Sequence, residues 1–364
     1  MKIGRATRRY EAWLREHCAV VAADLETKHE LMRRSVFSFF RGTFYRWMQL
    51  WPDVCVSLVE APTVPAIGDL HVENFGTWRD REGRLTWGVN DFDECAPLPY
   101  TLDLVRLAAS ALVAIREARL RLSTGEACRA ILRGYRRGLT LGGQPIVLEG
   151  RHHWLRHAAT AARHPAGAYW AAMRRLPEVH GAFPPGARKA LRATLPHPDL
   201  ALTFRHRVAG VGSLGRPRIV ALAIWQGSFI AREAKAWVPS AALWVEGRGR
   251  QKNYSRDTVE RAVRAPDPLL TFERQWIVRR LAPDCGRIEL VDLAHDRDER
   301  RLLDAMGWET ANVHLGHPKA QRRVLRHLRR HNRTWLVRAA EDMVGALTDD
   351  WRQWHARSGA RATR

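Results

Sequence analysis

The chain has 364 residues, of which 46% are hydrophobic and 27% charged, as in a folded globular protein and unlike a disordered or fibrous one. Its net charge of +22 comes mostly from arginine, and we attribute it to a compositional bias together with the handling of phosphate groups. No stretch approaches the roughly 18 apolar residues of a membrane span, and the five cysteines stand singly, so we expect a cytoplasmic protein with reduced thiols and no membrane partner.

The first third of the chain is predicted to be mostly helical. We expect an amphipathic helix over Tyr10–Arg34, a packed aromatic segment over Ser35–Trp51, and helices over Pro99–Arg119 and Gly125–Leu139. Between them, Thr63–Asp93 contains two short β-like runs, TVPAIGDL and RLTWGVNDFD, that end in polar residues. We therefore predict two strands that deliver side chains to one rim.

The remainder begins with residues 142–198, where we expect helical fragments and loops that form an insertion or a lobe boundary. Three β-like runs follow, LTFRHRVAG, RIVALAIW and GSFIAREAKAW, joined by glycine-containing turns as in an antiparallel meander. Further strands are predicted over Gln275–Leu281 and Arg287–Leu290, and helices over Leu302–Leu315 and Lys319–Trp354.

The strongest chemical pattern is GDLHVEN at residues 68–74, because an Asp followed five residues later by an Asn is the spacing of a kinase-type catalytic loop. In such a loop the Asp orients the acceptor hydroxyl and the Asn oxygen helps to hold Mg²⁺. The segment NDFDE at residues 90–94 offers carboxylates, which are the hard ligands that Mg²⁺ prefers. We predict Asp69, Asn74 and Asp91 as catalytic residues, and Asn74, Asp91 and Asp93 as metal ligands.

A glycine-rich run, GVGSLG at residues 210–215, lies between two β-like segments. Glycines allow the backbone to approach phosphate closely, and exposed N–H groups can bind phosphate oxygens. A plain hairpin turn is the alternative. We predict that ATP is bound here by Gly210, Gly212, Ser213 and Gly215.

A kinase-like site also needs a cation on the next strand, and the segment IAREAK at residues 230–235 contains two candidates. Arg232 and Lys235 are three residues apart, so on a regular strand they face opposite sides. The residue type favours Lys235, and Ile230 suits a wall beside an adenine, but the sequence leaves the choice open. Glu260, in the helical run Thr258–Ala265, is the natural carboxylate partner, although a solvated helix face explains it equally well.

The segments GDLHVENFG, NDFDE and DLVRLAAS, with SFFRG before them and GVGSLG, REAKA and MGWETANVH after them, resemble the bacterial family called domain of unknown function 2252 over nearly the entire chain. The GDLHxxN and DFD elements are also similar to those of aminoglycoside phosphotransferases and related small-molecule kinases. The resemblance implies that Asp69 is the catalytic base and that Asp103, at a helix start, stabilises the catalytic loop. Arg232 stands where the wider family has Lys, a departure that bears on catalytic competence.

The order of the motifs also departs from that of kinases, because here the catalytic loop precedes the glycine-rich loop. A circular permutation would reconcile the two orders: the sheet over Leu202–Leu290 would cover the nucleotide, and the helix over Leu302–Leu315 would resemble the helix that leads into the catalytic loop. We therefore expect an α+β, two-lobed, protein-kinase-like fold. Its parts would be a helical catalytic lobe (1–141), the insertion (142–198), an antiparallel-sheet lobe (199–292) and C-terminal helices (293–364).

The predicted function is transfer of a phosphoryl group from Mg²⁺·ATP to a hydroxyl acceptor that the sequence does not identify. One alternative is a catalytically weak, kinase-like module that binds a protein or, less favoured, a nucleic acid through the basic stretch Gln321–Arg333. A second is a metal-dependent phosphoesterase, because GDxH also begins such sites with Asp69 and His71 as ligands. That class also needs GDxxDR and GNH motifs, which this sequence lacks.

Overall fold

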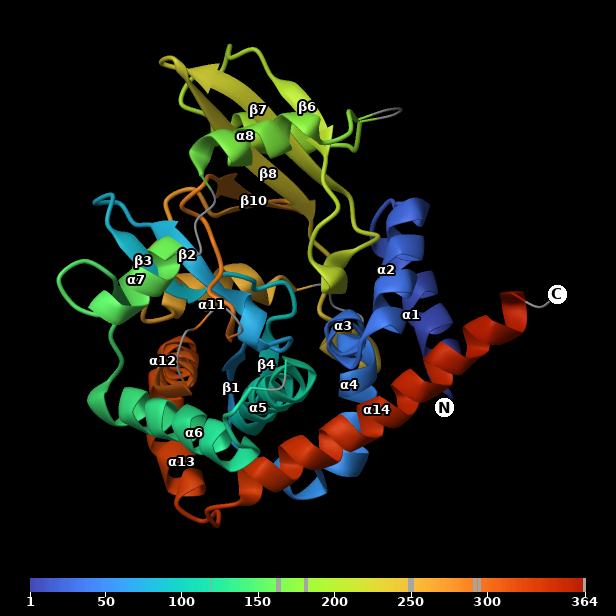
Figure 1. Ribbon diagram of the computed structural model, residues 1–364, viewed down its shortest axis with the longest axis vertical. Coiled ribbons are helices and arrows are strands. Elements are labelled where there is room, and N and C mark those ends of the chain that lie inside the picture. Colours follow the sequence, from blue (N-terminus) through green and yellow to red (C-terminus); the bar gives the residue numbers. More distant parts are fainter. Residues whose placement is uncertain are drawn as a thin grey trace.

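A computed structural model describes residues 1–362 except 119, 162–164, 180–182, 248–251, 291–292 and 294–295. It is a mixed α+β structure in which small antiparallel sheets accompany many helices (Figure 1). The helices are α1 (Ile3–His17), α2 (Ala22–Arg34), α3 (Val36–Gly42), α4 (Phe44–Val54), α5 (Tyr100–Ala118), α6 (Thr124–Leu141), α7 (His153–Ala161), α8 (Ala166–Arg175), α9 (Ala187–Arg192), α10 (Ala241–Val245), α11 (Tyr254–Arg261), α12 (Asp296–His314), α13 (Pro318–Leu328) and α14 (Trp335–Ala362). The strands are β1 (Thr63–Ala66), β2 (Phe75–Arg79), β3 (Leu85–Val89), β4 (Ala96–Pro99), β5 (Ile146–Val147), β6 (Thr203–His206), β7 (Arg218–Trp225), β8 (Ser228–Ala236), β9 (Thr271–Glu273) and β10 (Trp276–Leu281).

Helix α5 is the centre of the helical part. Its sequence is apolar on nearly every side, and its residues are buried almost throughout, which is the pattern of a helix enclosed by others. The C-terminal helix α14 runs along α5 and α4 (Figure 1), so the end of the chain packs against helices from its beginning. The C-terminal helices thus complete the same helical part that carries the first helices.

Helices α6 and α12 pack together most extensively, and two glycines allow their backbones to meet. A Cβ atom added at Gly134 would lie 1.8 Å from the carbonyl oxygen of Asp304, and one at Gly307 would lie 2.1 Å from that of Ile131. Such distances leave no room for any side chain. Close approach at this crossing is therefore what joins α12 to the N-terminal helices.

We expect Gly134→Ala to destabilise the protein by about 3 kcal/mol or more, because the new methyl group meets backbone that cannot rotate away. Urea unfolding followed by circular dichroism measures the change. Gly125→Ala, in the same helix, is the control: its methyl group would meet only the flexible end of Arg129, so its helix propensity should raise stability by up to about 1 kcal/mol. Equal effects of the two substitutions would contradict the close crossing.

The five-stranded sheet has the order β6-β7-β8-β10-β9 and is antiparallel throughout. It lies at one end of the molecule, with α8 across one face (Figure 1). Buried alanines at 221, 234 and 236 pack against α9 on the other face. The predicted antiparallel meander and the strand at 275–281 are confirmed.

The two strands predicted within Thr63–Asp93 exist as β1 and β3, but they do not pair with each other. β1 pairs with β4, whereas β3 lies between β2 and β5 in a separate three-stranded sheet. Each strand nevertheless ends at a polar loop, β1 before Asp69 and β3 before Asp91. The Asp69 loop and the Asp91 loop therefore follow strands of two different sheets.

Three of the predicted helices and strands are wrong. The helix expected over Tyr10–Arg34 is two helices, because Cys18 is extended and the Val21 N–H donates to the carbonyl of Gly215 instead of continuing a helix. The helix expected over Lys319–Trp354 is α13 and α14, separated by a turn in which Asn332 accepts the N–H of Thr334. No strand lies over residues 287–290, where the described backbone forms a single β-bridge from Arg287 to Gly76.

The expected helices over residues 99–119, 125–139 and 302–315 are present as α5, α6 and α12, although Arg119 lies outside the described residues. The aromatic segment over 35–51 is packed into the core through α3 and α4, as expected. No helix in the described ranges is long and apolar enough to cross a membrane.

Candidate active site

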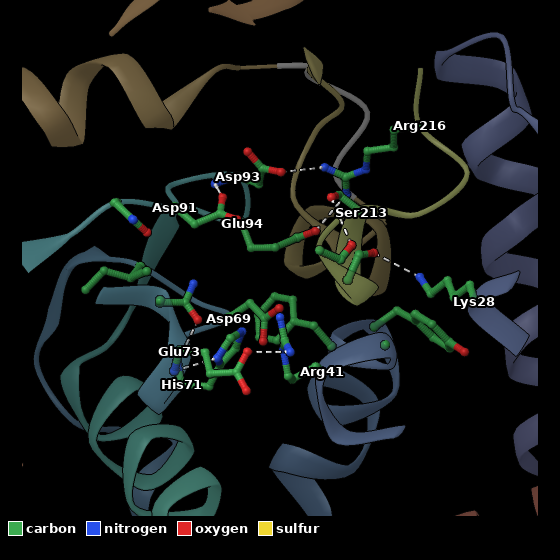
Figure 2. A pocket seen from close by; sticks show the side chains of 18 of the residues that line it. Lys28, Arg41, Asp69, His71, Glu73, Asp91, Asp93, Glu94, Ser213 and Arg216 are labelled. Carbon is green, nitrogen blue, oxygen red and sulfur yellow. Dashed lines mark hydrogen bonds and ion pairs between the residues drawn. The ribbon is translucent and has the colours of Figure 1, made fainter. Parts of the chain in front are cut away.

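A pocket of about 710 Å³ lies where the glycine-rich segment, the Asp69 and Asp91 loops and helices α1–α4 meet. Figure 2 shows Asp69, His71 and Arg41 on one side of this pocket and Asp91, Asp93 and Arg216 on the other. Its walls come from segments far apart in the sequence. The pocket therefore exists only in the folded chain.

The loop that carries Asp69 is held by the buried carboxylate of Asp103 on α5. Its two oxygens accept the backbone N–H groups of Ile67 and Gly68 at 2.7 and 2.8 Å. His314 of α12 lies 2.9 Å from the same carboxylate, with Tyr135 at 2.8 Å from its other ring nitrogen. The role expected for Asp103 thus has a physical basis, and the expected C-terminal helix supplies one of its partners.

Asp69 faces the pocket and forms an ion pair with Arg106 of α5, at 2.6 and 2.8 Å. Arg106 is fully buried, and its guanidinium lies over the rings of Phe40, Phe44 and Trp47 at 4.0–5.1 Å. Burial raises the pKa of Asp69, and Arg106 opposes this effect. The arginine therefore favours the ionised carboxylate that a base or a hydroxyl-orienting group needs.

His71 and Asn74 shape the rest of this loop. The backbone N–H of Glu73 donates to Nδ1 of His71, and the N–H of His71 donates to the amide oxygen of Asn74. Burial and the nearby Arg41 lower the pKa of His71 well below its usual value, so the ring is neutral with its proton on Nε2. His71 therefore offers a hydrogen-bond donor in the pocket.

The Asp91 loop is joined to the five-stranded sheet by an ion pair. The ammonium group of Lys235 on β8 lies 2.6 Å from Oδ2 of Asp93 and 3.2 Å from Oδ1 of Asp91. Burial acts to raise the pKa of Asp91, but Lys235, Arg279 and Arg218 together hold it well below its usual range. Burial and the neighbouring Asp91 raise the pKa of Asp93.

A second cation, Arg216, connects the sheet side of the pocket with the segment after Asp91. It is buried and lies 2.9 Å from Glu94 and 3.4 Å from Asp93. Glu94 also accepts the N–H of Ala241 at the start of α10, and burial raises its pKa. Five carboxylates and several cations thus line one pocket.

The glycine-rich segment reaches the pocket with three of its four predicted residues. Gly210, Gly212 and Ser213 line it, and a Cβ at Gly212 would lie 3.4 Å from Oδ2 of Asp69. Gly215 instead packs against Leu25 of α2 with φ +95°, which only glycine adopts readily. The segment therefore passes directly over the catalytic loop.

Helix α2 fastens this segment along its length. Besides the bond from the Val21 N–H to Gly215, the ammonium of Lys28 donates to the carbonyl of Gly212 at 2.9 Å, and Asp24 lies 3.0 Å from His206 at the end of β6. The break between α1 and α2 thus helps to hold the glycine-rich segment, because it frees the Val21 N–H to bind Gly215.

Of the two candidate cations on β8, only Lys235 faces the pocket side. Arg232 points to the opposite face, where its guanidinium donates to the carbonyl of Thr194. Glu260 is exposed on α11 and is not among the described residues that line the pocket, so the geometry does not support either as part of the site. The buried carboxylate of this sheet is Glu233, which binds Arg207, Arg218 and Arg279.

Several residues of the site were not predicted: Lys28, Arg41, Arg106, Arg216, Glu94 and Glu233. The sequence contained one hint for Arg41, because it lies in SFFRG, one of the segments that carry the family resemblance. Arg41 forms an ion pair with Glu73 at 2.5 Å, and Arg287 reaches the same carboxylate at 3.1 Å. Arg106, Glu94 and Glu233 lie in the quoted segments DLVRLAAS, NDFDE and REAKA. Lys28 and Arg216 had no local pattern that could distinguish them from ordinary charged residues.

The residues present suit a metal that arrives with phosphates better than a resident metal. In the described part of the chain, no group of three or more His, Cys, Asp or Glu side chains is arranged to hold a metal ion. Mg²⁺ commonly uses one or two protein oxygens and completes its shell with water and phosphate. Asn74 and Asp91 supply such oxygens at the pocket wall, so the donor set fits Mg²⁺ bound together with a nucleotide.

Residues 20–162 match the model of a bacterial family, described as uncharacterized protein conserved in bacteria (DUF2252). The match contains both the Asp69 and the Asp91 loop, together with α2–α6, and ends before the five-stranded sheet. This supports the expected family for the segment that carries the catalytic-loop pattern. No curated protein and no solved structure is similar enough to the chain to match it.

The end of β3, just before Asp91, is held by a buried acid on α12. Glu309 accepts the N–H of Val89 at 3.2 Å and the amide N–H of Asn312 at 2.8 Å. Burial raises the pKa of Glu309 from 4.5 to about 7, with Arg264 opposing the shift. The fold therefore favours the protonated carboxyl.

This position gives a pH-dependent prediction. A pKa raised by folding contributes stability that is complete below about pH 4.5 and is lost as the pH rises through about 7. We expect Glu309→Gln, which cannot titrate, to remove this loss, so that its stability relative to wild type rises by about 3 kcal/mol between pH 4.5 and pH 8. Urea unfolding across this range measures the difference, with exposed Glu260→Gln as the control. Parallel pH profiles of Glu309→Gln and wild type would disprove the proposed titration.

Proposed function

We propose that this protein is a kinase-like phosphotransferase that uses Mg²⁺ and ATP, with a two-lobed fold whose motif order is circularly permuted. The observation that carries the proposal is the ion pair from Lys235 on the sheet to Asp91 and Asp93, which lie in the same pocket as Asp69. A strand lysine, a metal-binding Asp and a catalytic Asp are the charged parts of a kinase site. Here Asp69 and Asp91 line one pocket, and Lys235 on a third segment contacts Asp91 and Asp93 from the sheet.

The order of elements in the sheet supports the same proposal. In protein kinases the glycine-rich loop joins two strands and the phosphate-binding lysine lies on the following strand. Here the glycine-rich segment joins β6 and β7, and Lys235 lies on β8. This agreement is independent of the Asp69 and Asp91 patterns, because it concerns a different part of the chain.

A larger hollow beside the pocket offers room for the base and ribose of a nucleotide. It is open to solvent and lies between the sheet, β2 and the segment after β10, with Tyr169, Met173 and Leu281 among its apolar lining. Four residues line both spaces: Asn90, Gly210, Arg279 and Arg287. A nucleotide bound in the larger hollow would thus direct its phosphates into the pocket.

Each residue then has a definite task. Asn74 and Asp91 would hold the metal, which supplies charge neutralisation to the phosphates. Lys235 would exchange its contact with Asp91 for a phosphate oxygen, and the N–H groups near Gly212 would cover the phosphates. Asp69, kept ionised by Arg106, would orient the acceptor hydroxyl. Most of the rate enhancement would come from positioning and electrostatics.

The geometry gives less support to a phosphoesterase. Asp69 is engaged by Arg106, and Nδ1 of His71 accepts a backbone N–H, so the two ligands that a phosphoesterase would need have other partners.

A binding module has one observation in its favour: α13 and the turn after it expose Arg322, Arg323, Arg326, Arg329, Arg330 and Arg333. These arginines lie beyond α6, at the opposite end of the molecule from the sheet (Figure 1).

The first test is a thermal shift with ATP and Mg²⁺. A ligand that binds only the folded state raises the melting temperature. We expect ATP with Mg²⁺ to raise that of wild type by several degrees, about 3 kcal/mol of stabilisation at a hundredfold excess over Kd, and to leave Asp91→Asn nearly unshifted. Asp342→Asn, outside the pocket on α14, is the control. A wild-type protein that shows no shift at millimolar ATP would rule out the proposed function.

The two cations on β8 form a matched pair for a second test. Lys235→Met should weaken nucleotide binding at least about tenfold, because a charge-assisted hydrogen bond to phosphate contributes about 1.5–3 kcal/mol. Arg232→Met, on the opposite face of the same strand, should bind nucleotide as wild type does. Isothermal titration with a non-hydrolysable ATP analogue distinguishes them. The reverse result would assign the phosphate contact to Arg232.

The binding-module alternative has its own test. Retention on heparin should fall steeply with salt if the exposed arginines of α13 bind polyanions. Replacing Arg322, Arg326 and Arg330 by Gln should then lower the eluting salt concentration without changing the ATP-dependent thermal shift. Salt-dependent retention together with a missing ATP shift would favour the binding module.

A further inference from the structure

Lys28 is a buried cation in the pocket wall whose charge no carboxylate balances directly. Its side chain is 4% exposed, and the ammonium group donates one hydrogen bond, to the carbonyl of Gly212. Within the described part of the chain it forms no ion pair. An ammonium has three N–H donors, so two of them are left for another partner.

The other cations of the pocket are paired. Arg41 and Arg287 share Glu73, Arg216 binds Glu94 and Asp93, and Arg279 binds Glu233. Lys28 is thus as buried as Arg216 but, unlike it, has no carboxylate partner within the described residues. Enclosing an unpaired ammonium costs several kcal/mol, and such groups concentrate at functional sites.

Burial lowers the pKa of Lys28 to about 8, with Arg216 adding to the effect. Asp69, Glu94 and Glu11 of α1 act in the opposite direction. At neutral pH the group therefore still carries most of its positive charge. An anion bound next to the ammonium would stabilise its positive charge and so offset the cost of burying it.

Lys28 lies away from the larger hollow in which the base and ribose are proposed to bind. It lines the smaller pocket but is not among the described residues that line the larger hollow. In Figure 2 it lies on the opposite side of the pocket from Asp91, next to Ser213, and Asp69 lies on the wall below both. Tyr10, Phe44 and Tyr45, contributed by α1 and α4, line the same pocket.

We propose that Lys28 is an anion subsite on the acceptor side of Asp69, which binds the phosphate or carboxylate of a small hydroxylated acceptor. The assignment rests on the proposed phosphotransfer, because it names the acceptor class for that reaction. The same pocket must also hold nucleotide phosphates, so the acceptor is small. The net charge of +22 favours the approach of anionic compounds and disfavours polycationic acceptors such as aminoglycosides.

The test uses sulfate as the probe and keeps the nucleotide site filled. Protein is saturated with Mg²⁺ and a non-hydrolysable ATP analogue, and sulfate is titrated against chloride at constant ionic strength while the melting temperature is followed. We expect wild type to show a saturable increase with sulfate and Lys28→Met to bind sulfate at least about tenfold more weakly. Lys28→Arg should retain much of the response. Lys189→Met, the same change at an exposed site on α9, corrects for the general stabilising effect of sulfate.

The outcomes separate the two proposals. A nucleotide shift without a saturable sulfate response in wild type would overturn the acceptor subsite and leave phosphotransfer standing. Weaker nucleotide binding in Lys28→Met with an unchanged sulfate response would assign Lys28 to the nucleotide phosphates and also overturn it. A missing nucleotide shift would remove phosphotransfer itself, whatever sulfate does. With glycerol 3-phosphate in place of sulfate we expect the same Lys28-dependent response, and with glycerol none.

A measurement on wild type alone covers the case in which Lys28→Met does not fold. Lysine acetylation by acetic anhydride at pH 8, analysed by mass spectrometry, is expected to modify Lys28 several-fold more slowly when sulfate is present. Lys189 should react at the same rate with and without sulfate. Equal protection of both residues would contradict a specific subsite.

Discussion

The buried carboxylate of Asp103 is the constraint on which the site depends. It binds the two backbone N–H groups before Asp69 and accepts a contact from His314, so one side chain joins the β1 loop, α5 and α12. A buried carboxylate must satisfy its oxygens with donors, and here the donors come from two segments far from α5 in the sequence, the loop after β1 and the end of α12. The close crossing of α6 and α12 at Gly134 and Gly307 is what brings His314 to that position. The catalytic loop is therefore held by the helical core and not by its own sequence alone.

The second organising feature is the charge balance across the pocket. Lys235 and Arg216 reach from the sheet side to Asp91, Asp93 and Glu94, which belong to the helical side. Such pairs lose much of their stabilisation to desolvation, so their value lies in fixing geometry more than in adding stability. The same contacts are the ones that Mg²⁺ and phosphates would replace in the proposed reaction. Lys28, in contrast, forms no ion pair within the described residues. For this reason we propose that it binds the anionic group of the acceptor.

Local patterns predicted most of the elements and the central residues of the candidate site. Hydrophobic periodicity located α5, α6, α12 and the β6–β8 meander, and the DLHVEN spacing located Asp69 and Asn74 in one loop of the pocket. Periodicity could not show that the helix expected over residues 10–34 is broken, because the break depends on a hydrogen bond from Val21 to Gly215, far along the chain. It also could not show that β1 and β3 belong to different sheets, since strand pairing is decided by partners elsewhere.

The sequence by itself determined that Asp69 and Asn74 belong to one loop, because spacing within one loop is a local property. It determined that Arg232 and Lys235 face opposite ways, since side chains alternate along a strand. Only the tertiary structure decided which of the two faces the pocket, and that Glu260 is remote while Lys28, Arg106 and Arg216 are near. The physical reason is that burial and charge pairing are properties of three-dimensional neighbours. A lysine on an amphipathic helix has the same local sequence pattern whether its ammonium meets water, a carboxylate or the bound anion proposed for Lys28.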